Sequence, residues 1–425
     1  MKSAIEHFKS FSKTPRCSFD AQKMRDFIVE FAKSIGYEAK VDKSDNILCV
    51  KKEPLVCLQS HYDMVCLGDA PHVEVYEKDG WIKAKNSTLG ADNGIGVALM
   101  MSMMERYDDI ECLFTSDEEV GLIGANNLEH SITSAYLLNL DSEEEGAIFI
   151  GCAGGVDITG EISSQKKSAK KDFIAYEISV NDLQGGHSGV DIDKNIPNAI
   201  KILAQELDDS CELVSINGGE RINSIPKSAS AVIYAAKDFA LKNRGLNIKK
   251  IKTDGDVLVY SHDIVKMLQK FAQGVRSFNS ELKIPNESIN LSTIKTDNDK
   301  ITVKFFARAM DKKSLEDLGK DTVDFLRSFG FDAVTEGFSA PWKPNITPFA
   351  KKLQQVVRKF FKNVEFKAIH AGLECGIFEN QNHSLQVASI GPNIHFPHSL
   401  RECCETASVW RLEKILEELI ADLRK

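Results

Sequence analysis

Residues 55–63 read LVCLQSHYD, a short apolar run that ends in a histidine and an aspartate. Two further runs end in a similar way, IECLFTS before Asp117 and AYLLNL before Asp141. Between the first two runs lies GIGVALMMSMMERY (residues 94–107), which is typical of a helix. Strands that alternate with helices predict an α/β layer with a largely buried, mixed sheet flanked by helices.

The pattern changes near residue 166. From there DFIAYEISVNDLQ alternates with period two, KITVKFFARAM is strand-like, and SLEDLGKDTVDFLRSFG is an amphipathic helix, which together indicate an α+β segment. The α/β pattern returns after GFSAPWKPN and ends in a long amphipathic helix. We therefore predict one domain formed by residues 1–165 and 341–425, interrupted by an inserted domain of residues 166–340.

Composition excludes several classes of protein. A net charge of -9 argues against binding to nucleic acid, and no apolar run reaches the roughly 18 residues of a membrane helix. The N-terminal MKSAIEHFKSFSK has no apolar core of a secretory signal. The ten cysteines form no CxxC pair, so we expect free thiols and a reduced, cytoplasmic protein. We expect no membrane partner, because no long apolar run is present.

Acidic and histidine side chains follow the predicted strands, and one more acid lies in the glycine-rich turn TLGADNGIG that opens the helix. In an open α/β sheet, ligands bind beyond the carboxyl ends of the strands. Each motif alone has an ordinary explanation, since HxD arises by chance and an acidic run is usually a solvated turn. Their shared placement predicts a divalent metal site. The residues are His61, Asp63, Asp92, Glu118, Glu119 and Asp141.

The spacing within these motifs suggests different roles for neighbouring acids. Asp63, two residues after His61, can hold the second ring nitrogen of that histidine. Of the adjacent Glu118 and Glu119, one can bind metal while the other acts as a base toward water. Two cations would neutralise this crowd of carboxylates.

The strings LQSHYDMVC, TLGADNGIGVA, LFTSDEEVG, LDSEEEG, LQGGHSG, HAGLECG and GPNIHFPHS resemble the M20 metallopeptidase family, and within it the aminoacyl-histidine dipeptidase branch. The resemblance covers most of the chain. It implies a zinc-peptidase-like catalytic domain whose inserted domain is a lid and a dimerisation surface. It also implies a cis peptide bond after Asp92.

The resemblance further implies two divalent ions, zinc before manganese or cobalt, with Asp92 bridging them. The implied ligands are His61, Asp92, Glu119, Asp141 and His398, and the family pattern FPHS selects His398 over His395. Asp63 would orient His61, and Glu118 would be the general base toward a water molecule activated by the metals. The expected reaction is hydrolysis of dipeptides of the Xaa-His type, including β-alanyl-histidine.

Residues of the inserted domain are expected to bind the substrate in a homodimer. His187 would stabilise the oxyanion, while Asn223 and Arg308 would hold the C-terminal carboxylate, for which arginine offers a bidentate grip. Glu374 would contact the amino end of the substrate. Two alternatives remain open, an M20 amidohydrolase that removes an acyl group from an amino acid and a non-catalytic peptide-binding relative.

Overall fold

The computed structural model describes residues 1–163, 167–168, 173–242, 245–252, 258–297 and 300–425, and these divide into two compact units. The first unit comprises Met1–Cys152, Trp342–Ala368 and Leu373–Lys425, and the second comprises Ala153–Pro341 and Ile369–Gly372. The predicted start of the inserted domain at residue 166 is too late. The reason is that β9 (Gly154–Ser163) pairs along its whole length with β20 (Lys300–Ala309) of the second unit.

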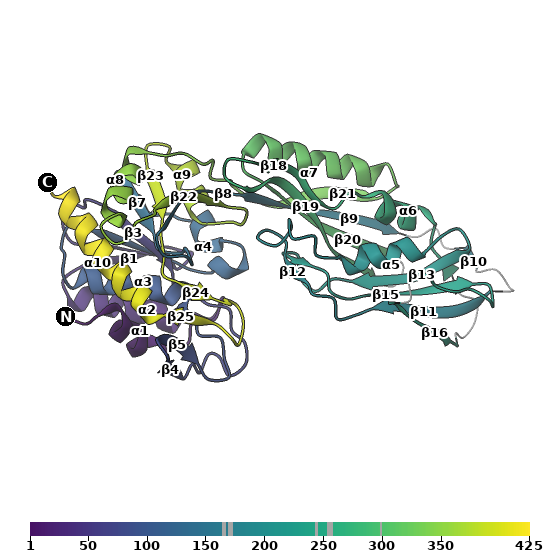
Figure 1. The fold of residues 1–425 in the computed structure, drawn as a ribbon, viewed down its shortest axis with the longest axis horizontal. Coiled ribbons are helices and arrows are strands. Elements are labelled where there is room, and N and C mark those ends of the chain that lie inside the picture. Colours follow the sequence, from purple (N-terminus) through teal and green to yellow (C-terminus); the bar gives the residue numbers. More distant parts are fainter. Residues whose placement is uncertain (164–166, 169–172, 243–244, 253–257, 298–299) are drawn as a thin grey trace. The chain divides into compact units, whose positions relative to one another are not determined.

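Among the described residues, the main sheet of the first unit has eight strands, in the order β1, β2, β6, β3, β7, β23, β8, β22 (Figure 1). The central strands β6, β3, β7 and β23 are parallel, so their carboxyl ends lie at one edge of the sheet. The register pairs His61 at the end of β3 with Thr115 at the end of β6. The bounds are β1 (Glu38–Val41), β2 (Ile47–Val50), β3 (Cys57–His61), β6 (Glu111–Thr115), β7 (Tyr136–Asn139), β8 (Ala147–Cys152), β22 (Glu365–Ile369) and β23 (Gln386–Ser389).

Helices cover this sheet and bury the apolar faces that the sequence predicts. Helix α3 is buried almost all round, because it lies against β3 and against both α1 and α10. Helix α2 buries Met24 and Ile28, and α10 buries Val409, Leu412 and Leu416. The helices are α1 (Ala4–Phe11), α2 (Gln22–Ser34), α3 (Ala91–Met104), α4 (Ile123–Asn126), α8 (Pro348–Val357), α9 (Cys375–Gln381) and α10 (Thr406–Leu423), with a short 3-10 helix η1 (Glu118–Val120). A smaller sheet holds β4 (Val75–Lys78), β5 (Trp81–Ala84), β24 (Ile394–His395) and β25 (Cys403–Glu405).

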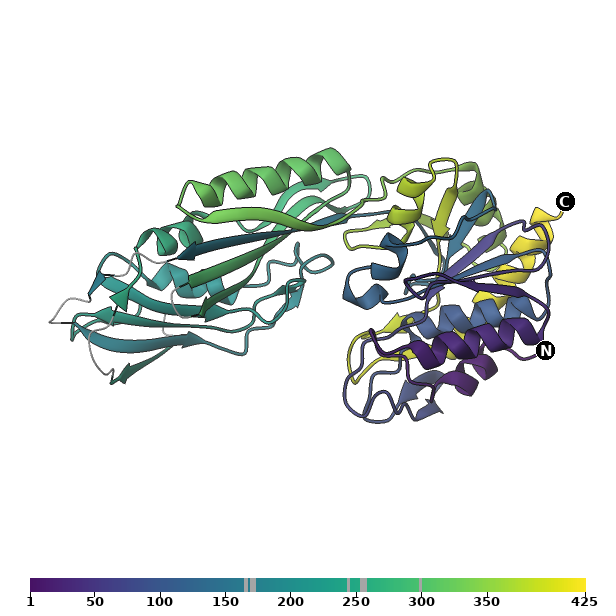
Figure 2. The same ribbon diagram turned by 180° about the vertical axis from the view of Figure 1, so that it is seen from behind.

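The second unit is an antiparallel sheet with helices packed on it, as the α+β pattern predicts (Figure 2). One apolar cluster joins the sheet to α5 (Ala199–Glu206), α6 (Asp263–Lys270) and α7 (Lys312–Arg327). Its main strands are β9, β11 (Ile174–Val180), β13 (Cys211–Gly218), β15 (Ala229–Ala235), β16 (Asn247–Ile251), β18 (Gly274–Asn279), β19 (Ile284–Asp297), β20 and β21 (Asp332–Ser339). Two short pairs are β10 (Lys167–Ser168) with β17 (Leu258–Val259), and β12 (Gly186–His187) with β14 (Ser224–Ile225).

The expectation that all cysteines are free thiols is wrong, because a disulfide joins Cys17 to Cys66. Their Cα atoms lie 5.5 Å apart, although 49 residues separate them in the sequence. The two cysteines meet because a β-bridge pairs the backbones of Cys17 and Met64. The spacing of the cysteines in the sequence does not reveal this contact. The other eight cysteines are buried and are not part of a disulfide in the described structure.

No helix in the described part of the chain combines the length and the apolar character needed to span a bilayer.

Candidate active site

The edge of the main sheet where the parallel strands end carries the predicted site residues of the first unit. His61 is the last residue of β3, and Asp141 follows the end of β7. Glu118 and Glu119 form the short helix after β6. Asp92 lies in the first turn of α3, which begins after Gly90 in a left-handed conformation (φ 64°). Strand order and helix start thus bring distant parts of the sequence to one place.

The carboxylate of Asp92 lies between two imidazoles. Its Oδ1 is 3.2 Å from Nε2 of His61, and its Oδ2 is 3.1 Å from Nε2 of His398. On one side, Oδ1 of Asp141 lies 3.4 Å from the same nitrogen of His61. On the other side, Oε2 of Glu119 lies 2.8 Å from Nε2 of His398. Asp92 thus lies within reach of two histidines and of the acids beside them.

Three groups of possible ligand atoms, each with all atoms within 4.8 Å of one another, occur among the described residues. Two of them, His61–Asp92–Asp141 and Asp92–Glu119–His398, contain all five predicted ligands and have Asp92 in common. The third, His61–Glu118–Glu119, would make Glu118 a ligand instead of a base. The structure therefore brings the five residues together and places Glu118 beside them.

The electrostatics of this cluster fit divalent cations. Nε2 of His61 faces Asp92 and Asp141, although one ring nitrogen can serve only one acceptor at a time. Burial and repulsion from Asp92 raise the pKa of Glu119 to about 7, and its Oε1 is buried without a partner in the described part of the structure. Buried carboxylates in excess of nearby positive charge are costly unless a cation compensates them. Imidazole and carboxylate donors suit zinc, manganese or cobalt.

Asp63 is placed to orient two residues at once. It is fully buried, and its Oδ1 lies 3.3 Å from Nδ1 of His61, which turns Nε2 of that ring toward Asp92. The same oxygen accepts a hydrogen bond from the backbone N–H of Glu118 at 3.0 Å. Burial, together with repulsion from Glu119 and Asp141, raises the pKa of Glu118 well above its ordinary value. A carboxyl group of raised pKa beside the ligand cluster suits proton transfer.

The turn that carries Asp92 has the geometry that the resemblance implies. The peptide bond between Asp92 and Asn93 is cis, which confirms that prediction. The side-chain amide of Asn93 donates to Oδ1 of Asp141 at 2.6 Å and to the carbonyl of Leu140 at 2.9 Å. Asn93 therefore holds Asp141 as a hydrogen-bond donor, which an ionised carboxylate at position 93 could not do.

Glu402 is a site residue that the sequence did not reveal. Its carboxylate, only 4 % exposed, accepts hydrogen bonds from four successive backbone N–H groups at the start of α3. The donors are those of Leu89 (2.8 Å), Gly90 (3.0 Å), Ala91 (2.7 Å) and Asp92 (3.3 Å). Glu402 thus satisfies donors that a helix start leaves without intrahelical partners, and it anchors the turn that carries Asp92.

Replacing Glu402 with alanine is expected to lower the free energy of unfolding of the first unit by about 3 kcal/mol, because several buried donors lose their acceptor. Urea unfolding of metal-free protein, followed by tryptophan fluorescence, measures this. Trp81, Trp342 and Trp410 all belong to the first unit and so report on it. Alanine at the exposed Glu53 serves as control, and a Glu402 variant as stable as this control would contradict the anchoring role.

Two further sequence predictions concern Glu374 and His395. Glu374 is 0 % exposed and accepts hydrogen bonds from Gln59 (2.5 Å) and Thr115 (2.8 Å). Burial raises its pKa to about 7. Its contact with the substrate stays a prediction. His395 contacts Trp81, with ring centroids 4.9 Å apart and the ring planes tilted by 48°, and it belongs to none of the ligand groups found in the described residues.

In the second unit, His187 and Arg308 pack around Gly189, and Asn223 contacts the same loop. A side chain at Gly189 would lie 3.1 Å from both Cε1 of His187 and Nε of Arg308. Nδ1 of His187 accepts the backbone N–H of Gly189 at 3.1 Å, so the proton of the neutral ring is assigned to Nε2. The carbonyl of Asn223 accepts the N–H of Ser188 at 2.9 Å. These three predicted substrate residues are thus neighbours within one unit.

His370, which the sequence did not single out, belongs to the same cluster. Its Nε2 lies 2.7 Å from the hydroxyl of Ser288, and its carbonyl oxygen would lie 2.3 Å from a Cβ at Gly189. Burial, with help from the positive charge of Arg308, lowers the pKa of His370 to about 3. The folded protein therefore holds this ring neutral throughout the pH range of most assays.

The low pKa of His370 makes the second unit sensitive to acid. Below about pH 6.5 the unfolded chain takes up a proton that the folded unit excludes down to about pH 3, so stability falls as the pH is lowered. The expected loss from this group is about 2 kcal/mol between pH 7 and pH 5. Calorimetry should show a smaller loss in His370→Gln, with His262→Gln as control in the same unit. An identical pH dependence in wild type and His370→Gln would contradict this assignment.

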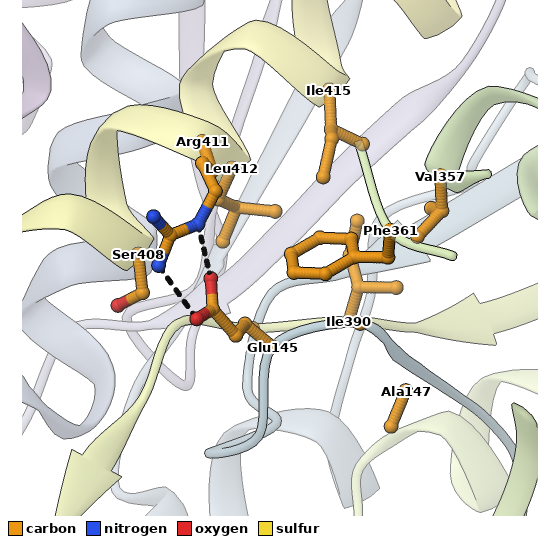
Figure 3. A pocket seen from close by; sticks show the side chains of 11 residues that line it. Glu145, Ala147, Val357, Phe361, Ile390, Ser408, Arg411, Leu412 and Ile415 are labelled. Carbon is orange, nitrogen blue, oxygen red and sulfur yellow. Dashed lines mark hydrogen bonds and ion pairs between the residues drawn. The ribbon is translucent and has the colours of Figure 1, made fainter. Parts of the chain in front are cut away.

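A small pocket of the first unit lies between α10, α8 and the strand ends near Ile390 (Figure 3). Its cavity volume is about 10 Å³, which suffices for about one water molecule. The charged groups at its rim satisfy each other, because Arg411 donates to both carboxylate oxygens of Glu145 at 2.7 and 2.6 Å. None of the predicted site residues lines this pocket, and it is too small for a substrate.

Comparison with known proteins agrees with this geometry. The profile of "Peptidase family M20/M25/M40" matches residues 57–422, and the chain therefore belongs to this family of peptidase enzymes. Members of the family depend on metal, and the described residues include candidate metal-binding groups around Asp92.

Individual relatives extend over the whole chain. The chain is 31% identical to the "Cytosol non-specific dipeptidase" of Escherichia coli (strain K12), covering 98% of this chain and 96% of the relative. It resembles the crystal structure of an aminoacylhistidine dipeptidase from Vibrio alginolyticus, with 25% identity, a TM-score of 0.79 and coverage of 99% and 96%. A tripeptidase from Staphylococcus aureus, 16% identical with a TM-score of 0.62 and coverage of 99% and 98%, shares the fold.

Proposed function

We propose that this protein is a metal-dependent dipeptidase that binds two divalent ions. The ions are zinc, with manganese or cobalt as alternatives, held by His61, Asp92, Glu119, Asp141 and His398. The observation that carries this proposal is the carboxylate of Asp92, which has one oxygen near each of two histidines. The dipeptidases among the relatives support the class of substrate.

Bound divalent ions would supply Lewis acidity, which polarises the scissile carbonyl and makes a water molecule more acidic. The protein's own groups then handle the proton. Glu118, held through its backbone N–H by Asp63, takes the proton from the attacking water and returns it to the leaving amine. Asp63 keeps His61 in one orientation through Nδ1.

We further propose that the second unit contributes to recognition of the substrate. Arg308 and Asn223 bind the C-terminal carboxylate of the dipeptide, and His187 donates from Nε2 to the developing oxyanion. The assigned tautomer of His187 supports a donor role, since its Nδ1 already accepts a backbone N–H. Glu374 is proposed to interact with the amino end. Preference for histidine at the second position is proposed on the likeness to the aminoacylhistidine dipeptidase.

Homodimerisation through the second unit and a cytoplasmic location complete the proposal. The name of the Escherichia coli relative supports the location. Disulfides are uncommon in the cytoplasm of mesophiles, so the redox state of Cys17 and Cys66 in cells tests whether the bridge and the proposed location are compatible. Thiol labelling of protein from lysed cells should find this pair oxidised if the bridge exists in that compartment.

A substrate panel with and without chelator tests the function. We expect turnover of unblocked dipeptides, with Xaa-His and β-alanyl-histidine among them, and loss of turnover on chelation. Turnover of N-acylated amino acids alone would identify a deacylase instead. No turnover of any substrate by protein loaded with zinc, manganese or cobalt would leave a peptide-binding relative.

A further inference from the structure

The segment Arg16–Phe19 lies outside the part of the chain that matches the family profile, yet it contacts three turns of the candidate active site. We propose that this segment is a positioning element of the active site. Ser18 fixes the carboxylate of Asp63, Arg16 holds the turn that carries Asp92, and Phe19 holds the turn that precedes Glu118. The inference rests on the proposed function, because it assigns Asp63 and Glu118 to catalysis.

The segment is fastened to the chain that follows Asp63. The N–H of Met64 donates to the carbonyl of Arg16 at 2.9 Å, and the N–H of Ser18 donates to the carbonyl of Met64 at 3.4 Å. The disulfide between Cys17 and Cys66 joins the same two stretches. A covalent bond and backbone pairing together therefore keep Ser18 beside Asp63.

Ser18 completes the set of contacts that holds Asp63. Its hydroxyl donates to Oδ2 of Asp63 at 2.7 Å, while Oδ1 faces His61 and the N–H of Glu118. The other contact of Oδ2 is a longer one, from the N–H of Glu119 at 3.4 Å. Without the hydroxyl, Oδ2 of Asp63 keeps the longer contact with the N–H of Glu119. The carboxylate can then rotate away from His61 and from the N–H of Glu118.

Phe19 ties the segment to the turn that precedes Glu118. Its N–H donates to Oδ1 of Asp117 at 2.6 Å. Phe19 has φ 65° and Asp117 has φ 48°, both in the left-handed region that side chains disfavour. Phe19 is 66 % exposed and adds little to the core, so packing of its side chain does not explain the backbone conformation. The hydrogen bond to Asp117 explains this backbone conformation. Residues held in the left-handed region cluster at functional sites.

Arg16 reaches the turn that precedes Asp92. Arg16 is 1 % exposed, and its Nη2 donates to the carbonyl of Gly90 at 2.7 Å. A Cβ at Gly90 would lie 2.5 Å from Nη2, and one at Gly94 would lie 2.8 Å from it, so these glycines make room for the cation. A buried arginine here offsets part of the negative charge of the nearby acids, Glu402 and Asp63 among them.

The test compares Ser18→Ala with Ser18→Thr, which keeps a hydroxyl, and with Ser34→Ala, whose exposed serine donates to the carbonyl of Phe31 in its own helix. In zinc-loaded protein we expect Ser18→Ala to lower kcat about tenfold with KM changed less than about twofold, because loss of a group that orients a ligand typically costs 10–100-fold. Ser18→Thr should recover most of the loss. Metal content should stay equal in all variants, and tryptophan fluorescence checks that the first unit is folded.

A spectroscopic measurement separates this inference from the proposed function. Cobalt replaces zinc, and the visible absorption of the cobalt-loaded protein reports the geometry around the ligands even if no dipeptide is cleaved. We expect an altered spectrum for Ser18→Ala and wild-type spectra for Ser18→Thr and Ser34→Ala. Wild-type kcat and spectrum in Ser18→Ala, or equal defects in the alanine and threonine variants, would overturn the inference.

Discussion

Glu118→Gln should lower kcat by about 1,000-fold while the protein keeps its metal, because the amide cannot accept the proton of the attacking water. The substitution preserves the size of the side chain and leaves the backbone N–H of residue 118 bonded to Asp63. Burial raises the pKa of Glu118 well above its ordinary value, which makes its carboxylate a better proton acceptor than that of an exposed glutamate. Steady-state kinetics on an unblocked dipeptide, with metal analysis of the same sample, measure the effect.

The control is Glu129→Gln, an exposed acid that pairs with Lys43 away from the ligand groups. Full activity of Glu118→Gln would remove Glu118 from catalysis. Loss of one metal together with activity would instead make Glu118 a ligand, as the group His61–Glu118–Glu119 allows. The metal content alone distinguishes the loss of a catalytic base from the loss of a metal ligand.

Removal of the metal should abolish turnover and also destabilise the first unit. The clustered acids around Asp92 lose their compensating charge, and Oε1 of Glu119 is left buried without a partner among the described residues. A ligand present at 100 times its dissociation constant stabilises by about 2.7 kcal/mol, which corresponds to a melting temperature higher by about 5 °C or more. Thermal unfolding followed by tryptophan fluorescence, with and without chelator, measures this.

Re-addition of zinc, manganese or cobalt after removal of the chelator controls for damage by the treatment. Both activity and melting temperature should return. Turnover that persists in protein shown by mass spectrometry to hold no metal would contradict a metal-dependent reaction.

The sequence predicts the first unit well because two simple patterns coincide there. The apolar runs are buried parallel strands, and the polar residues after them, such as His61 and Asp141, necessarily meet at the edge where those strands end. The amphipathic helices follow from helical spacing of apolar residues, which is a local property. Asp92 could be found because a glycine-rich turn opens a helix.

The features that the sequence did not predict depend on contacts between distant segments. Glu402 acts through a carboxylate that reaches backbone groups some 310 positions away in the sequence, which no local pattern records. Ser18 meets Asp63 only because β3 and the N-terminal segment lie together. The transfer of Ile369–Gly372 to the second unit likewise depends on packing rather than on composition.

The most direct test of the account is an anomalous diffraction measurement on crystals of the zinc-loaded protein. We predict two zinc peaks per chain, one beside His61 and Asp141 and one beside Glu119 and His398, with the carboxylate of Asp92 between them. A single peak, no peak, or peaks that Asp92 does not join would contradict the shared-carboxylate site on which the proposed function depends.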